Sequence, residues 1–162
     1  MASTHKKVIV RKTDRDSVTG WVGPVFASDG RLEMINASGK LVTLPLDEVK
    51  GVYFVRDWEN SEEIVRKSFA ARPRSEGLWV RLTFRDQETL EGMMGNELSQ
   101  FTPDGFLITP PDLRGNTQKV FVPRNALQQF TIMGVITTAM AKKRPASVTP
   151  GQGQPRLFAE AE

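Results

Sequence analysis

The chain has 162 residues, 39% of them hydrophobic and 25% charged, which is typical of a globular protein with room for one ordinary domain or two small ones. It contains no cysteine, which excludes disulfides and thiolate zinc sites and favours a reducing cytoplasmic environment. The net charge is +3, but four of the 22 basic residues and two of the 19 acidic residues follow residue 141. The rest of the chain is nearly neutral, so its charge requires no broad polyanion-binding face.

The first third of the chain alternates apolar and polar residues with a period of two, which predicts β-strands. Gly20 and Gly23 lie inside the longest predicted strand, where glycines mark a bend. Residues 45–49 begin with proline and suit a single helical turn. The predicted strands cover residues 8–13, 18–26, 31–36, 40–44 and 51–55.

The second half repeats this pattern, with an offset that grows from 72 to 75 to 78 residues at polar loops. Equivalent pairs are Val8 and Val80, Asp14 and Asp86, Gly20 and Gly92, Gly23 and Gly95, Gly30 and Gly105, Val42 and Val120, and Pro45 and Pro123. The strands predicted for this half cover residues 78–84, 90–95, 106–109, 119–122 and 129–133, with a turn over 123–127. We therefore predict a mainly β chain of two tandem small five-stranded antiparallel barrels, one over residues 6–56 and one over 77–140.

The segment between the repeats, residues 57–76, has the pattern of a short helix. Asn60 and Glu63 form a capping-box pattern, and an apolar stripe follows, so we expect a helical connector that packs on a barrel. The alternative interpretation is a basic patch that binds phosphate or an acidic partner. Its residues are Arg66, Lys67, Arg72 and Arg74.

Residues 141–162 are rich in Lys, Pro, Gly and Gln and are expected to form a disordered tail. Within it, Gln154-Pro155-Arg156-Leu157-Phe158 resembles the Q-x-x-L-F peptide that docks on the bacterial sliding clamp. The tail could therefore bind another protein. No membrane partner is expected, because the longest mostly apolar run, residues 130–140, is too short to span a bilayer.

The inventory of catalytic groups is small. His5 is the single histidine and lies near the N-terminus, which leaves no histidine-based triad and no zinc ligand set. The carboxylates Asp86, Glu88 and Glu91 cluster at a predicted hairpin, where solvated acids are common. We interpret the chain as a non-enzyme without cofactor or metal.

The order of five strands, a bent second strand and a one-turn helix before the last strand resembles the Sm-like fold, and within it the bacterial Hfq family. Asp104-Gly105-Phe106 is similar to the Hfq hairpin that carries a base-stacking phenylalanine, and residues 116–127 are similar to the strand and turn that follow. The resemblance implies that Phe106 stacks on a base, and that Arg124 and Asn125 contact uridine-rich RNA. Phe106 as a plain core residue is the alternative.

In the first repeat the three positions are occupied by Arg31, Leu46 and Asp47, which do not form such a site. The chain also resembles an uncharacterised bacterial family of tandem Sm-like proteins, through residues 52–58 and Arg72-Pro73-Arg74. Sm-like proteins form rings through free strand edges, which implies a ring of three chains, a pseudo-hexamer. The predicted function is a non-catalytic scaffold that self-assembles, with RNA as the first ligand to test.

A cyclic-dinucleotide adaptor that resembles the PilZ type is the competing prediction, alongside a protein-interaction module. Arg11 and Arg15 match the R-x-x-x-R element of PilZ proteins, and so do Arg81 and Arg85. Neither pair is followed by the second element of that motif, and alternate residues on a strand explain the second match without a ligand.

Overall fold

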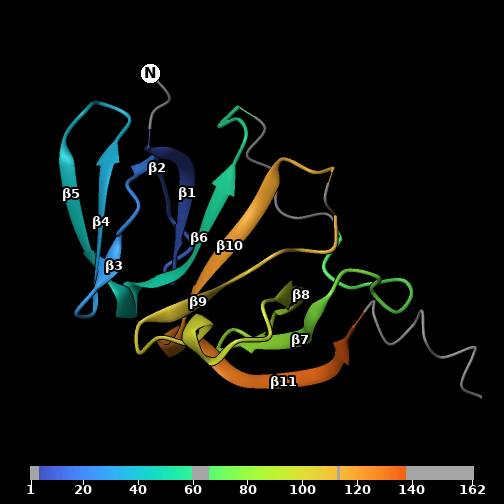
Figure 1. The fold of residues 1–162 in the computed structure, drawn as a ribbon. Coiled ribbons are helices and arrows are strands. Elements are labelled where there is room, and N and C mark those ends of the chain that lie inside the picture. The colour runs from blue at the N-terminus through green and yellow to red at the C-terminus, as the bar shows by residue number, and fades with distance from the viewer. Residues whose placement is uncertain (1–3, 60–65, 113, 138–162) are drawn as a thin grey trace, which may run out of the picture.

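The computed structural model describes residues 4–59, 66–112 and 114–137, and over these residues the chain is mainly β without an α-helix (Figure 1). The first repeat contains β1 (Lys6–Lys12), β2 (Ser17–Val22), β3 (Ala27–Ser28), β4 (Arg31–Asn36), β5 (Leu41–Pro45), the 3-10 turn η1 (Leu46–Glu48) and β6 (Val49–Val55). The second contains β7 (Gly77–Phe84), β8 (Thr89–Met94), the 3-10 turn η2 (Leu98–Gln100), β9 (Gly105–Ile108), β10 (Thr117–Pro123), the 3-10 turn η3 (Arg124–Ala126) and β11 (Leu127–Ile136).

The two repeats share one strand order. In the first repeat, β6, β1, β2, β4 and β5 are successive antiparallel neighbours. In the second repeat, β11, β7 and β8 pair in the same way, and so do β9 and β10. A two-way backbone bridge between Met93 and Thr109 joins β8 to β9, at the place where β2 meets β4 in the first repeat.

The prediction that each repeat closes into a barrel is wrong. In the described ladders β5 does not pair with β6, nor does β10 pair with β11. Instead β6 pairs with β10, so one eight-stranded sheet runs from the first repeat into the second, and β11, β7 and β8 form a three-stranded sheet. The physical reason is that β6 and β10 are the end strands of their repeats, and pairing them satisfies two open backbone edges at once.

The connector contains no helix over its described parts, residues 57–59 and 66–76. Its backbone bonds to β8 instead of to itself: the Glu91 N–H donates to the Lys67 carbonyl at 2.7 Å, and the Phe69 N–H donates to the Glu91 carboxylate at 3.1 Å. These bonds use the polar groups that a helix would need for its own ladder. The predicted helix start at residues 60–65 and the predicted tail lie outside the described residues, and the segment boundaries given above stay predictions.

Each repeat has its own buried apolar cluster. Val8 and Val10 lie at the centre of the first, and their equivalents Val80 and Leu82 at the centre of the second, all fully buried. The clusters exchange residues across the boundary between the repeats: Phe121 of β10 belongs to the first cluster, and Tyr53 of β6 packs against the second.

Two equivalent glycines allow the second strand of each repeat to approach the next strand closely. A Cβ on Gly20 would lie 2.2 Å from the Ile35 carbonyl oxygen, and one on Gly92 would lie 2.9 Å from the Thr109 carbonyl oxygen. Both distances are too short for a side-chain carbon. Glycine is therefore needed at these positions because the neighbouring strand lies so close, and not only because the strand bends there.

Gly20→Ala is therefore expected to destabilise the protein by about 1–3 kcal/mol, because β2 and β4 must separate to admit a methyl group. Gly134→Ala is the matched control, since a Cβ there would meet only the Trp79 ring, at 3.8 Å. Urea unfolding followed by tryptophan fluorescence measures both. Equal midpoints for the two variants would contradict the close approach.

Candidate functional site

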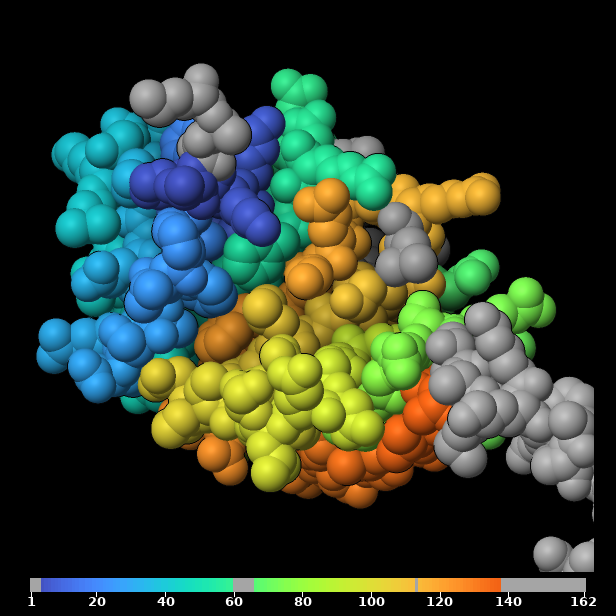
Figure 2. All heavy atoms as spheres, viewed as in Figure 1, coloured from blue at the N-terminus to red at the C-terminus, as the bar shows by residue number. Residues whose placement is uncertain are grey.

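The boundary between the repeats is held by the antiparallel ladder of β6 and β10. Its register places Val55 opposite Thr117, Phe54 opposite Lys119, Tyr53 opposite Val120 and Val52 opposite Phe121. The Phe121 ring enters the first repeat, where its centroid lies 5.1 Å from that of Phe26 in an edge-to-face contact, and only 6% of the residue is exposed. In the space-filling view the two repeats meet along one continuous boundary (Figure 2).

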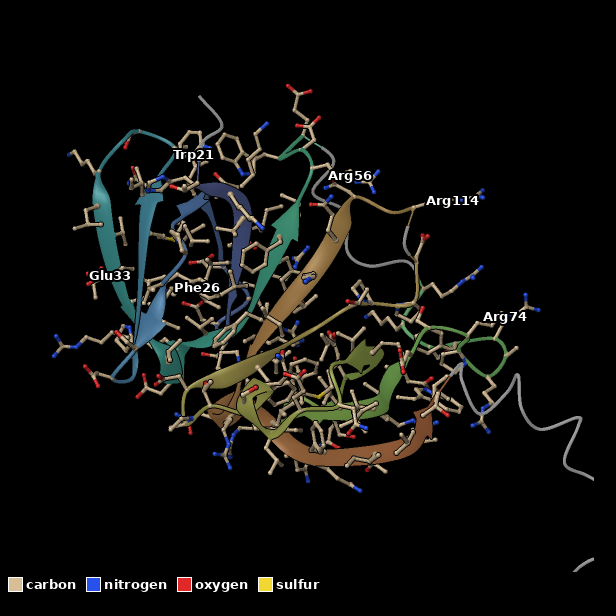
Figure 3. All side chains as sticks on the ribbon, in the orientation of Figure 1. Trp21, Phe26, Glu33, Arg56, Arg74 and Arg114 are labelled. Carbon is tan, nitrogen blue, oxygen red and sulfur yellow. The ribbon has the colours of Figure 1, made fainter. Side chains whose placement is uncertain are left out.

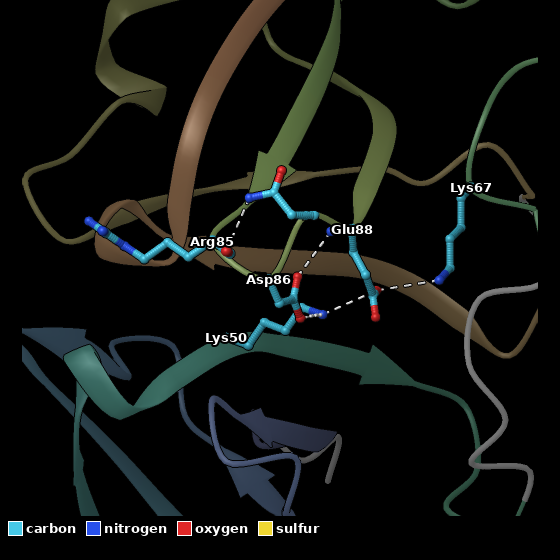
Figure 4. Close-up of polar contacts among 6 residues, drawn as sticks. Lys50, Lys67, Arg85, Asp86 and Glu88 are labelled. Atoms are coloured by element: carbon cyan, nitrogen blue, oxygen red, sulfur yellow. Dashed lines mark hydrogen bonds and ion pairs between the residues drawn. The ribbon is translucent and has the colours of Figure 1, made fainter.

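A charged cluster links the same two repeats beside this ladder. The Lys50 ammonium on β6 lies 2.7 Å from the Asp86 carboxylate and 3.1 Å from the Glu88 carboxylate, and Lys67 lies 3.4 Å from Glu88 (Figure 4). Burial raises the pKa of Asp86 and Glu88, but hydrogen bonds and charge attraction from Lys50 outweigh it and hold both pKa values below the ordinary range. Asp86 and Glu88, two of the three carboxylates that cluster at the predicted hairpin, are therefore ionised partners of Lys50.

Glu91 is the third carboxylate of the group and faces the connector. Its side chain is 7% exposed and accepts hydrogen bonds from the Phe69 N–H at 3.1 Å and the Trp79 indole at 3.0 Å. The Arg81 guanidinium completes the set with an ion pair at 3.1 Å. Burial raises the pKa of Glu91, but these donors outweigh it and lower the pKa below the ordinary value of 4.5. Glu91 thus ties the connector to the second repeat.

The predicted RNA-contact residues lie near one another but are not equally accessible. Phe106 is 4% exposed, and its ring packs edge-to-face against Phe130 at 5.3 Å and tilted against Phe101 at 5.7 Å. Arg124 and Asn125 are exposed on η3. The burial of Phe106 therefore favours its alternative role as a core residue, and RNA contact by these three residues stays a prediction.

A hollow of about 420 Å³ lies beside β11 and η3. Its lining residues are Phe101, Phe106, Arg124, Leu127, Gln128, Gln129 and Phe130. Phe101 is 36% exposed and places part of its ring at the surface. No strong sequence signal marks this residue, because Phe101 follows an irregular stretch outside the predicted strands.

The strand registers correct the predicted equivalence of the two hairpins by one residue. Met34 lies opposite Val42, and Ile108 lies opposite Val120, so Ile108 is equivalent to Met34. Phe106 is then equivalent to the buried Leu32, and not to the exposed Arg31. The reason is that the loops before these hairpins differ in length and conformation, since the second repeat inserts η2 there.

The predicted basic patch is divided by the structure. Lys67 is half-buried and bonded to Glu88, whereas Arg66, Arg72 and Arg74 are exposed (Figure 3 shows Arg74 at the periphery). The use of these arginines as a binding surface stays a prediction.

The second arginine pair of the PilZ-type prediction has local partners. Arg81 is paired with Glu91, and the Arg85 side chain donates to the Asn125 carbonyl. Arg11 stacks over the Tyr53 ring at 5.2 Å. Three of the four arginines of this prediction thus have local partners, and binding of a cyclic dinucleotide stays a prediction.

β5 and β11 each have an open edge in the described ladders, besides the short strand β3 and the strands β8 and β9, which only the single Met93–Thr109 bridge joins. β5 pairs only with β4, and β11 pairs only with β7, and the two strands lie on different outer sides of the molecule (Figure 1). Both edges carry exposed apolar side chains: Leu41 on β5 is 70% exposed, and Ile132 and Val135 on β11 are 52% and 49% exposed. Exposed apolar residues on an open edge are typical of strand-pairing surfaces.

The chain belongs to the family of unknown function DUF6982, whose model matches residues 4–134. This confirms the prediction of an uncharacterised family, while the match itself assigns neither an Sm-like fold nor an activity. No curated protein and no solved structure matches the chain. Over the described residues, no helix has the length and hydropathy of a membrane span, and no cluster of three or more acidic or histidine side chains could hold a metal ion.

The carboxylates of this site predict the pH dependence of folding. The folded-state pKa of Glu91 lies below its ordinary value of 4.5, so its stabilising effect is complete above that value and is lost as the pH falls through the depressed pKa. Asp86 and Glu88 act in the same direction. Glu91→Gln is expected to cost about 2–3 kcal/mol at pH 7, because a hydrogen-bonded buried charge is lost. It should also make the decline in stability below pH 4.5 less steep.

Urea midpoints measured at several pH values between 3 and 7 test this expectation. The matched control is Glu33→Gln, which removes an exposed carboxylate on β4. Parallel curves for Glu91→Gln and the wild type would contradict the assigned role of Glu91.

Proposed function

We propose that this protein is a non-catalytic cytoplasmic scaffold with an Sm-like strand order, which assembles by pairing β5 of one copy with β11 of the next. The observation that carries the proposal is the ladder between β6 and β10. This ladder joins β6, the last strand of the first repeat, to β10 of the second repeat. The equivalent of β6 is β11 and the equivalent of β10 is β5, and both of these strands have open edges. A second copy can therefore extend the sheet in the way that the chain already extends it internally.

The internal ladder also defines the register between copies. Lys119 lies opposite Phe54 inside the chain, and the 78-residue offset makes Leu41 and Ile132 the equivalents of these two residues. Leu41 of one copy would then lie opposite Ile132 of the next, which buries two of the most exposed apolar side chains of the described residues. Apolar area removed from water favours such pairing by about 25 cal/mol per Å².

Head-to-tail contacts of this kind form a closed ring where the rotation between copies permits it. The Sm-like resemblance favours six repeats, which is three chains. RNA binding through Phe106, Arg124 and Asn125 is not part of this proposal, because Phe106 is only 4% exposed.

Light scattering on the purified protein tests the assembly. The wild type is expected at three times the mass of one chain, and Ile132→Asp and Leu41→Asp should each shift it toward one chain. Each variant places a charge in the apolar contact and should weaken association about tenfold or more.

Leu98→Asp is the matched control, because Leu98 is 88% exposed but does not lie on either open edge. It should leave the assembly unchanged. A wild-type mass equal to one chain at micromolar concentration would overturn the proposal.

A further inference from the structure

The hollow beside β11 is the equivalent of a place that is filled in the first repeat. Its residues Phe106, Leu127 and Phe130 correspond to Leu32, Val49 and Val52, by the strand registers and the 78-residue offset. Arg124 corresponds to Leu46, and Phe101 stands before the same hairpin as Phe26. All five first-repeat residues belong to the cluster that surrounds Phe121 or pack against it. We refer to the hollow beside β11 as the empty socket, and to the Phe121 site as the filled socket.

The filled socket shows what such a site accepts. Phe121 reaches it from a strand that is hydrogen-bonded to β6, and Leu107 on the neighbouring strand packs beside it. The occupant is therefore an extended segment with one aromatic side chain that points into the socket. The open edge of β11 offers the same backbone groups to such a segment as β6 offers to β10.

The first repeat has no strand with an aromatic side chain at the position equivalent to Phe121. The equivalents of Phe121 and Leu107 are Thr43 and Glu33, which are paired on β5 and β4 and are both exposed. Figure 3 shows Glu33 on the outer side of the first repeat. A second copy that adds β5 to β11 would thus present Thr43 to the empty socket and leave most of it unfilled.

We propose that the empty socket binds an extended segment of another protein that adds to β11 as an antiparallel strand and inserts an aromatic side chain. The segment carries a carboxylate near the aromatic residue, because Arg124 is exposed at the rim, where the filled socket has the buried Leu46, and has no ion-pair partner among the described residues. The inference rests on the open β11 edge of the proposed scaffold. Binding there would compete with β5 of a second copy and so terminate assembly.

A fluorescent peptide that copies residues 117–123 of β10 tests the socket. Its binding is measured by fluorescence anisotropy with the full-length Leu41→Asp variant. In this variant β11 of every copy stays open, because the substituted β5 of another copy no longer pairs with it. The peptide is expected to bind, and its Phe121→Thr counterpart should bind about tenfold to a hundredfold more weakly, because the aromatic ring is no longer buried. A peptide with an aspartate in place of Pro123 should bind more tightly than the copy, and Arg124→Ala in the protein should abolish that gain.

Two protein variants locate the binding. Phe101→Ala opens the socket and should weaken the peptide several-fold, whereas Leu98→Ala, on the neighbouring turn and outside the lining, should not. Equal binding of the phenylalanine and threonine peptides, or no binding of either, would overturn the proposal. Displacement of the bound peptide by oligo-U RNA at low salt would also overturn it, because the hollow would then be a nucleic-acid site.

This result is independent of the assembly test. A wild type that forms oligomers while the peptide fails to bind keeps the scaffold and removes the socket. A wild type that stays a single chain while the peptide binds removes the assembly and keeps the open β11 edge as a peptide-binding site.

Discussion

The structure depends on the ladder between β6 and β10 and on the Phe121 side chain that it positions. Each repeat has roughly the size at which a core alone is marginally sufficient for folding. The repeats compensate by exchanging residues: Phe121 completes the core of the first, and Tyr53 covers the core of the second. Lys50 and its two carboxylate partners add a charged contact beside the ladder, so both apolar and ionic groups fix one relative orientation. The two repeats of the chain therefore form one structural unit.

Much of this arrangement could be predicted from the repeat within the sequence. The recurring spacing of glycines and prolines predicts equivalent strands, and the structure gives both halves the same strand order. Gly20 and Gly92 also mark the close strand crossings. The pairing of β6 with β10 could not be predicted in the same way. Alternation of apolar and polar residues determines which face of a strand is buried, but it does not determine which strand lies beside an open edge.

The errors at the candidate site have local causes. The capping-box pattern and the apolar stripe of the connector favour a helix. Over residues 66–76, the bond from the Glu91 N–H to the Lys67 carbonyl and the bond from the Phe69 N–H to the Glu91 carboxylate override that preference. The hairpin equivalence shifted by one residue because the preceding loops differ in conformation, and one residue is enough to reverse the face of a strand. That shift placed Phe106 at an exposed position in the prediction, whereas the register makes it the equivalent of buried Leu32.

The difference between the repeats carries more functional information than their similarity. If copies of the chain met through the same contacts that join the two repeats, β4 and β5 would carry the same apolar pair as β9 and β10. Instead Leu107 and Phe121 stand on the inner junction, and Glu33 and Thr43 stand at the equivalent positions of the outer face. Polar residues at the outer face weaken a contact between copies relative to the internal contact, because no aromatic ring is buried there. In the proposed scaffold the internal junction would thus be permanent, whereas the open edge of β11, with its unfilled aromatic-lined hollow, would exchange one partner strand for another.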